Sequence, residues 1–200
     1  MNLKKRVGIF IFDDVEILDF SGPYEVFSST RLTKNLTANI YKTPCPFRVF
    51  TFSEKKKYIT TSGGLCVKSE YTFNTCPPLD IMIIPGGIGT RKLLQNKKVL
   101  NWISLNQNIE FLASVCTGAL LLAQAGLLKE KKATTHWGAM NLLKKISTST
   151  KVITNKKFVF DTYYTSSGVS AGIDLSLYII EKLYGKKIAL NTAKYMEYKY

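Results

Sequence analysis

The sequence predicts an α/β protein built on a mostly parallel sheet with helices on both faces. Three observations lead to this prediction. Apolar, strand-like runs alternate along the chain with helix-like runs. Residues 81–84 are wholly apolar, as expected of a central strand buried on both faces, and they are followed by Pro85-Gly86-Gly87. Another apolar run ends abruptly at Cys116, where a helix-like run begins.

The elements can be assigned in chain order from their residue patterns. Short apolar runs predict strands at 6–12, 47–53, 80–84, 111–115 and 132–135. Helical spacing of apolar residues predicts helices at 23–31, 99–105, 118–128, 137–146, 173–183 and 186–194. Ser21 is the expected N-cap of the first helix, with Pro23 in its first turn. Residues 152–154 and 158–162 flank Asn155-Lys156-Lys157 and resemble a β-hairpin.

Length and composition fit a single globular domain spanning residues 1–200. Hydrophobic residues make up 46% of the chain and charged residues 21%, as in ordinary soluble proteins. The apolar run after the basic start is short and ends at Asp13-Asp14, so a first strand explains it better than a signal peptide does. No run reaches the length of a membrane span. We therefore expect a cytoplasmic protein.

The formal net charge of +14 raises the question of a nucleic-acid partner. The lysines come mostly as scattered pairs at element ends and in loops. The densest cluster, Lys55-Lys56-Lys57, lies between two strand-like runs and is interpreted as a hairpin tip. Solvation is the usual explanation of such charges. We expect no nucleic-acid partner from this pattern, although a fold can bring separate pairs onto one face.

The four cysteines, Cys45, Cys66, Cys76 and Cys116, form no C-x-x-C pair. His136 is the single histidine, so the chain has too few well-spaced ligands for a Cys/His metal site. The cysteines do not resemble a disulfide scaffold either. We expect no metal site.

Residues Ser114-Val115-Cys116-Thr117-Gly118 have the outline of a nucleophile elbow, a sharp strand-to-helix turn that presents one side chain. Gly118 leaves room where the backbone bends tightly. The helix-terminal N–H groups and the helix dipole favour a thiolate over a thiol at such a turn. The alternative is a buried structural cysteine, because free cysteine is among the most buried residue types.

Sites in open α/β sheets form where strands end and helices begin. Four loops are therefore expected to meet: 13–21, 85–87, the elbow and 134–137. Asp19 can donate a proton to the Cys116 sulfur or to substrate, or activate a water, with Glu16 as a reserve candidate. The alternative for Asp19 is a favourable charge near a helix N-terminus.

Four further residues have a functional and a structural interpretation. The N–H groups of Gly86 and Gly87 can form half of an oxyanion hole with that of Thr117, or simply make a tight turn. The Thr117 hydroxyl can bind substrate or pack in the first helical turn. His136 can act as a base for Cys116, line the pocket, or be a satisfied core histidine.

Together these segments resemble the PfpI/ThiJ superfamily, which shares the class I glutamine-amidotransferase-like fold, a flavodoxin-like, doubly wound sheet. The matching stretches are 18–27, 80–93, 114–128, 133–143 and 165–185, in family order. Isonitrile hydratases and the sensor domains of AraC-type regulators are the most similar members. The resemblance implies that Cys116 is the nucleophile and that Asp19 is the acidic residue beside it. Thr117 matches the residue after the nucleophile, and Gly87 matches the oxyanion-hole turn.

Departures from the superfamily patterns disfavour two activities. PfpI-type peptidases have a histidine directly after the nucleophile, where this chain has Thr117. Glutamine-amidotransferase triads need a late His-x-Glu, and no histidine follows His136. The regulators carry a C-terminal helix-turn-helix region, which we do not expect in a chain that ends at Tyr200.

The resemblance implies a cysteine-dependent hydratase that converts small isonitriles to N-substituted formamides, needs no cofactor and forms a homodimer. One alternative is a non-enzymatic ligand or peroxide sensor that uses Cys116. Another is hydrolytic or glyoxalase-like thiol chemistry. All three stay open at this point, because one fold hosts many chemistries.

Overall fold

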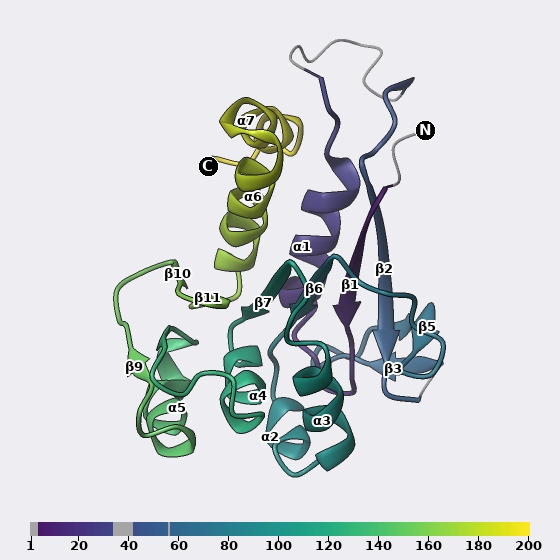
Figure 1. Cartoon of the computed structure of the whole chain (residues 1–200). Helices are drawn as coiled ribbons and strands as arrows, with labels where there is room; N and C mark the ends of the chain where they lie inside the picture. Colours follow the sequence, from purple (N-terminus) through teal and green to yellow (C-terminus); the bar gives the residue numbers. More distant parts are fainter. Residues whose placement is uncertain (1–3, 34–41, 56) are drawn as a thin grey trace.

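A seven-stranded sheet forms the centre of the computed structural model, which describes residues 4–33, 42–55 and 57–200 (Figure 1). The strand order is β10-β11-β7-β6-β1-β2-β5. Every neighbouring pair is parallel except β10–β11, so the predicted mostly parallel sheet is confirmed. The strands are β1 (Lys5–Phe10), β2 (Phe47–Ser53), β5 (Tyr71–Thr72), β6 (Ile81–Ile84), β7 (Phe111–Val115), β10 (Phe158–Phe160) and β11 (Tyr164–Ser166).

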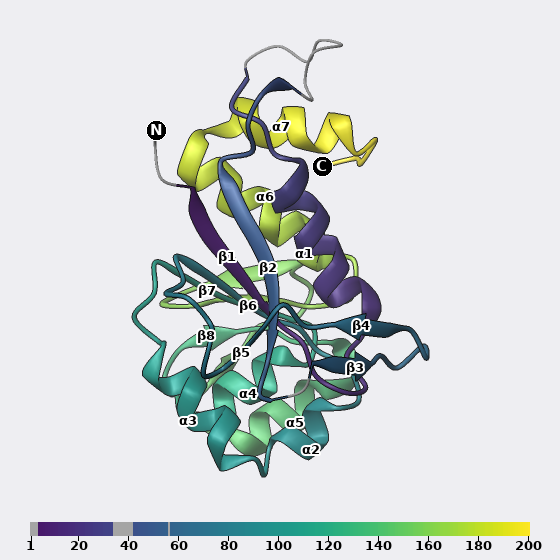
Figure 2. The same cartoon turned by 90° about the vertical axis from the view of Figure 1, so that its right-hand side faces the viewer.

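Helices cover both faces of this sheet, as predicted (Figures 1 and 2). One layer consists of α1 (Ile17–Ser29), α6 (Ala171–Tyr184) and α7 (Lys186–Tyr195). The other consists of α2 (Thr90–Leu93), α3 (Lys97–Leu105), α4 (Gly118–Gln124), the 3-10 helix η2 (Trp137–Ala139) and α5 (Met140–Ile146). The sheet is doubly wound, because the chain adds β2 on one side of β1 and then β6 and β7 on the other.

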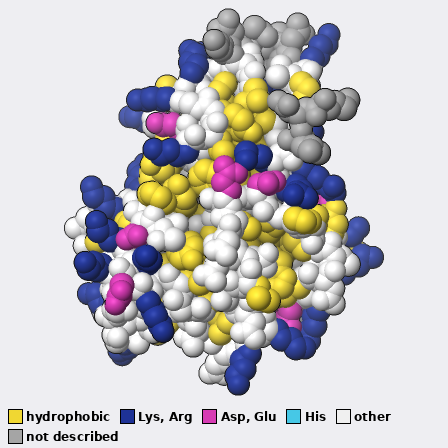
Figure 3. Space-filling view, viewed as in Figure 1, with side chains coloured by type: hydrophobic (Ala, Val, Ile, Leu, Met, Phe, Trp, Pro, Cys, Tyr) yellow, Lys and Arg dark blue, Asp and Glu magenta, His cyan; other side chains and the backbone are white. Residues whose placement is uncertain are grey.

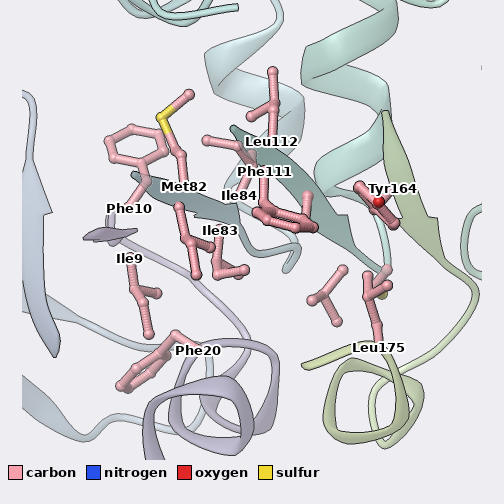
Figure 4. Packing of buried hydrophobic residues seen from close by; sticks show 14 of the residues in the cluster. Ile9, Phe10, Phe20, Met82, Ile83, Ile84, Phe111, Leu112, Tyr164 and Leu175 are labelled. Atoms are coloured by element: carbon pink, nitrogen blue, oxygen red, sulfur yellow. The ribbon is translucent and has the colours of Figure 1, made fainter. Parts of the chain in front are cut away.

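Buried apolar side chains fill the space between the sheet and both helix layers (Figure 4). All of Ile81–Ile84 is at most 1% exposed, as the wholly apolar run predicts. Phe10 and Met82 lie on one face of the sheet, whereas Ile9 points toward Phe20 of α1 on the other. This packing holds in place the carboxyl ends of β1, β6 and β7, where the candidate site lies.

The first helix begins earlier than the sequence predicts. It starts at Ile17 rather than at residue 23, and Glu16 instead of Ser21 is its N-cap residue. Pro23 lies inside the helix, where it lacks the N–H that would bond to the Asp19 carbonyl. Burial of the helix's inward face outweighs this loss. As a result, Asp19 belongs to the first helical turn and is held by the helix, not by a loop.

The hairpin predicted at 152–162 is wrong. β9 (Lys151–Val152) pairs in parallel with β8 (Lys132–Ala133), and β10 pairs with β11 in an antiparallel manner. β11 is a buried strand that pairs in parallel with β7. Strands this short carry too little pattern to specify a partner, so long-range packing decides it.

The hairpin with a tip at Lys55-Lys56-Lys57 is also wrong. The strand after this segment, β3 (Tyr58–Thr60), pairs with β4 (Cys66–Lys68) in a separate two-stranded sheet. The strand before it, β2, pairs with β1 and β5. Lys56 itself lies outside the described residues, as does the segment 34–41 before β2.

The other helices lie close to their expected positions. The helix expected at 118–128 ends at Gln124, and the one expected at 137–146 is divided into η2 and α5. α6 ends at Tyr184 and is followed by Gly185, whose φ of 87° favours glycine. Within the residues that the structure describes, no helix is long and apolar enough to cross a membrane.

Candidate active site

Cys116 occupies a sharp turn between β7 and α4. Its φ is 55°, a conformation that a non-glycine residue rarely adopts. Its N–H donates to the Ser166 carbonyl of β11 at 3.1 Å. A Cβ at Gly118 would lie 2.0 Å from the Ile84 carbonyl oxygen, so only glycine allows this close approach of α4 to β6. The structure therefore has the geometry of the predicted nucleophile elbow.

Asp19 is fully buried beside the elbow. Its Oδ2 accepts a hydrogen bond from the Gly86 N–H at 2.9 Å. Its Oδ1 is buried, and among the described residues no partner meets hydrogen-bond geometry there. Burial raises the pKa of Asp19 to about 7, against the opposing Gly86 hydrogen bond and with added repulsion from Glu16. At neutral pH the carboxyl group is therefore present in both its protonated and its ionised form.

The Cys116 thiol is coupled to this carboxyl group. Burial, followed by the negative charge of Asp19, raises the pKa of Cys116 to about 12. The Thr117 N–H and hydroxyl lower that pKa, but by less than burial raises it. The expectation that the helix start favours a thiolate is thus outweighed by desolvation. The resting site holds a neutral thiol next to a carboxyl group that exchanges its proton near pH 7.

Thr117 joins the elbow to the turn after β6. Its Oγ1 accepts from the Gly87 N–H at 3.0 Å and lies 3.2 Å from the Thr90 Oγ1. A Cβ at Gly86 would lie 2.5 Å from the Thr117 nitrogen and 2.8 Å from Asp19 Oδ2, so the turn packs tightly on both. In this state the N–H groups of Gly86 and Gly87 are already occupied. For Gly87 to serve in the predicted oxyanion hole, the hydrogen bond from the Gly87 N–H to the Thr117 hydroxyl must therefore break.

His136 follows β8 in the chain, and its side chain makes a hydrogen bond within its own segment. Its Nδ1 accepts from the Gly138 N–H at 3.2 Å, and its ring lies 5.2 Å from that of Trp137. The groups that shift the pKa of Cys116 belong to Asp19 and Thr117, not to His136. These contacts give no support for a Cys–His dyad, and His136 lines neither the cavity beside α1 nor the one at the end of β1.

Three supporting residues were not singled out in the sequence analysis. Thr135 donates from its hydroxyl to the Cys116 carbonyl at 2.8 Å. Ser166 accepts the Cys116 N–H, and Thr90 donates to the Gly87 carbonyl at 2.8 Å. The available signals were that Thr135 lies in a loop expected to reach the site and that Ser166 belongs to a run of small polar residues before a helix. The four predicted segments meet here through the contacts of Asp19, Gly86, Cys116 and Thr135, although Asp19 contributes from the first turn of α1 and not from a loop.

The site has no cluster of metal ligands. Throughout the described ranges, no group of three or more His, Cys, Asp or Glu side chains lies together in a way that holds a metal ion. A cavity of about 600 Å³ runs beside α1 and is lined by Phe20 and Tyr24, but not by Cys116 or Asp19. The Asp19–Cys116 pair is thus not part of the lining of this cavity, and Cys116 is only 6% exposed.

The sequence and the structure of this chain were each compared with known proteins, and both comparisons point to the same family. The isonitrile hydratase of Pseudomonas putida is 33% identical over 195 residues, which cover 96% of this chain and 78% of that protein. The HTH-type transcriptional regulator GbdR of Pseudomonas aeruginosa is 24% identical over 92% of this chain, which spans about half (48%) of the regulator's length. A THiJ/PfpI family protein from Pseudomonas syringae has a similar structure, with a TM-score of 0.84, 26% identity, and coverage of 98% of this chain and 76% of that one.

The fold is shared more widely. Drosophila melanogaster DJ-1beta superposes with a TM-score of 0.80 at 17% identity, covering 99% of this chain and 100% of that one. At this identity the likeness concerns the fold alone. The DJ-1/PfpI family description matches residues 5–182, nearly the whole α/β domain. With its parallel sheet and cysteine elbow, this chain belongs to the DJ-1/PfpI family.

Proposed function

We propose that this protein is a cysteine-dependent hydratase that converts a small isonitrile, R–N≡C, to an N-substituted formamide. The carrying observation is the buried Asp19–Cys116 pair, in which a carboxyl group with a pKa of about 7 lies next to a thiol at an elbow. A group with a pKa near the working pH transfers protons efficiently in both directions. The 33% identity to an isonitrile hydratase supports this choice of substrate.

The first half of the reaction forms a thioimidate. Protonated Asp19 donates its proton to the terminal carbon of the isonitrile, and the Cys116 sulfur forms a bond to the same carbon. The thiol proton passes to the Asp19 carboxylate as the sulfur attacks. Because Asp19 supplies and recovers the proton, the high pKa of Cys116 does not require a resting thiolate. The product is R–N=CH–S on Cys116.

The second half consumes one water. Asp19 protonates the nitrogen and takes a proton from the water, whose oxygen attacks the thioimidate carbon. The tetrahedral adduct then collapses: the C–S bond breaks, the hydroxyl proton passes through Asp19 to sulfur, and R–NH–CHO leaves. Thr117 and the Gly87 N–H hold the polar atoms of the adduct after their mutual hydrogen bond opens. His136 lines the approach to the elbow.

The decisive experiment measures formamide production from a panel of small isonitriles. We compare the wild-type protein with Cys116→Ala, Asp19→Asn and the control Cys66→Ala, which removes an exposed cysteine on β4. We expect Cys116→Ala to abolish turnover and Asp19→Asn to lower it by roughly 10²- to 10⁴-fold. Cys66→Ala retains wild-type turnover.

Two outcomes contradict the proposal. One is a wild-type protein that turns over no isonitrile in an assay where an authentic isonitrile hydratase is active. The other is unchanged turnover in Cys116→Ala. Inactivity on 2-oxoaldehydes in the same assays would remove the glyoxalase-like alternative.

The second candidate function is a ligand sensor. The similarity to the transcriptional regulator GbdR favours it, because this chain matches about half of that protein's length. A peroxide sensor fits less well, since the raised pKa of Cys116 leaves little of the reactive thiolate. Isonitrile binding without turnover, measured by calorimetry and abolished by Asp19→Asn, would favour the sensor over the enzyme.

We also infer a homodimer that forms through the outer face of α1 and the β3–β4 sheet. Large apolar side chains are 38–56% exposed there: Leu18 and Tyr24 on α1, with Tyr58 and Leu65 on the hairpin. The adjoining cavity is lined by both acidic and basic residues, so the charge there is locally mixed. Sedimentation velocity should give a dimer for the wild type and a monomer for Tyr24→Lys. A dimer in both would contradict this interface.

The cytoplasm is the proposed location. All four cysteines are free thiols, as expected in a reducing compartment. Fractionation of the source cells should recover the protein with cytoplasmic markers, and recovery outside the cell would contradict this.

A further inference from the structure

A lysine-rich stretch of the sequence becomes one surface in the fold. Residues 129–157 contain eight lysines and one acidic residue, Glu130, which gives a net charge of +7. This is half of the net charge of the whole chain, which is +14. The stretch contains β8, η2, α5 and β9, and α5 and β9 lie together at one side of the molecule (Figure 1).

Strand pairing and helix packing bring the lysines together. Lys132 of β8 is the register partner of Lys151 of β9, and the Lys151 N–H donates to the Lys131 carbonyl at 2.8 Å. α5 contacts β9 and has Lys144 and Lys145 in its last turn. Dark blue side chains line the side of the molecule that carries β9 and α5 (Figure 3). We call this surface the basic lobe: Lys129, Lys131, Lys132, Lys144, Lys145 and Lys151.

Few acidic groups neutralise the basic lobe. Five of its lysines are exposed and Lys131 is half-buried. Within the described residues, none of the six takes part in an ion pair. The acidic neighbours are Glu130 and Asp161, whose Oδ2 accepts the Lys132 N–H at 3.0 Å. Six ammonium groups therefore outnumber two carboxylates.

An exposed aromatic ring adjoins the lysines in the chain. Trp137 of η2, between β8 and α5, is 81% exposed. Large exposed indoles are unusual on a monomer surface, whereas an unpaired base stacks readily on one. Proteins that bind single-stranded nucleic acids combine a positively charged surface with exposed aromatic side chains.

We propose that the basic lobe binds the phosphate backbone of a single-stranded nucleic acid, with Trp137 as a stacking platform. A polymer of regularly spaced phosphates neutralises several lysines at once and releases their counterions. The lysines line neither of the cavities at α1 and at the end of β1, so the lobe suits a polymer better than a small enclosed anion. Lysines act as point charges on flexible stems, so this binding is independent of base sequence.

The test is fluorescence anisotropy with a labelled single-stranded oligonucleotide of about 20 nucleotides, in salt from roughly 50 to 200 mM. The lobe variant carries Lys→Gln at 132, 144, 145 and 151. The control variant carries Lys→Gln at 97, 98, 186 and 187, four exposed lysines that begin α3 and α7. Both variants lose the same net charge, so a difference between them reports position and not total charge. Circular dichroism checks that both are folded.

We expect the lobe variant to bind at least about tenfold more weakly and to lower the slope of log affinity against log salt by roughly 3. The control variant stays within about threefold of the wild type, and Trp137→Ala weakens binding with no change in the salt slope. Equal losses in the two lysine variants would overturn the proposal, as would no binding by the wild type at low salt. Equally tight binding of polyglutamate or of anionic phospholipid vesicles would also overturn it, by assigning the lobe to an acidic protein or to a membrane.

Discussion

The elbow at Cys116 and the basic lobe lie next to each other, but the elbow buries its ionisable side chains whereas the lobe exposes most of them to solvent. β8 carries Lys132 of the lobe and leads to Thr135, whose hydroxyl bonds to the Cys116 carbonyl. At the elbow, removal from water raises the pKa of a carboxyl and of a thiol. In the lobe, most ammonium groups remain in water and are available to a partner. Exposure to solvent, which the fold sets, decides whether such a residue is tuned for chemistry or for binding.

The largest expected effect is a pH dependence of stability that comes from Asp19. Its pKa is about 7 in the folded state against 3.8 when exposed, so the folded protein binds this proton more tightly. The associated stability is complete below about pH 4 and is lost as pH rises through 7, by on the order of 4 kcal/mol. Chemical denaturation from pH 4 to 8 measures the unfolding free energies of the wild type and of Asp19→Asn. As the pH rises, the wild type should lose stability relative to the variant. A pH-independent difference would mean that Asp19 is ionised throughout.

The second prediction concerns packing at the elbow. Gly118→Ala places a Cβ 2.0 Å from the Ile84 carbonyl, so backbone must move, and we expect a loss of ~3 kcal/mol of unfolding free energy. Gly168→Ala is the matched control, because a Cβ there meets no atom within 4 Å. Urea denaturation compares the two. Similar stabilities would show that the strand-to-helix turn relaxes easily.

Alkylation kinetics sharpen the comparison between buried and exposed groups. At pH 7.5 we expect iodoacetamide to label Cys116 at least about tenfold more slowly than the exposed Cys66, because its thiolate is scarce. Asp19→Asn removes the charge that disfavours the thiolate and should increase the Cys116 rate. Peptide mass spectrometry resolves the two sites. Faster labelling of Cys116 than of Cys66 in the wild type would show that the helix start outweighs burial.

The smallest expected effect is on the stability of the lobe itself. Lys144→Gln with Lys145→Gln should change the unfolding free energy by less than about 0.5 kcal/mol, because both side chains are exposed and unpaired by described residues. Thermal denaturation at low salt measures it. A clear stabilisation would mean that repulsion among the lysines strains the fold, whereas a clear loss would reveal a structural role for them.

The central strands were predictable because burial on both faces leaves a local signature. The apolar run at β6 and the run ending at Cys116 specify strand position within a residue or two. The start of α1 was not predictable, since the tertiary packing of its inward face overrides the proline signal at residue 23. The pairings of β8 with β9 and of β10 with β11 were missed because two- and three-residue strands lack a readable period.

The sequence by itself determined the α/β class, the elbow and the identity of the candidate residues, because periodicity and turn chemistry act between near neighbours in the chain. Only the tertiary structure decided that the Asp19 carboxyl faces Cys116, that their pKa values rise, and that separate lysine pairs share one lobe. Distance across the chain and access to water set these properties, and both arise only when the helices and strands pack together.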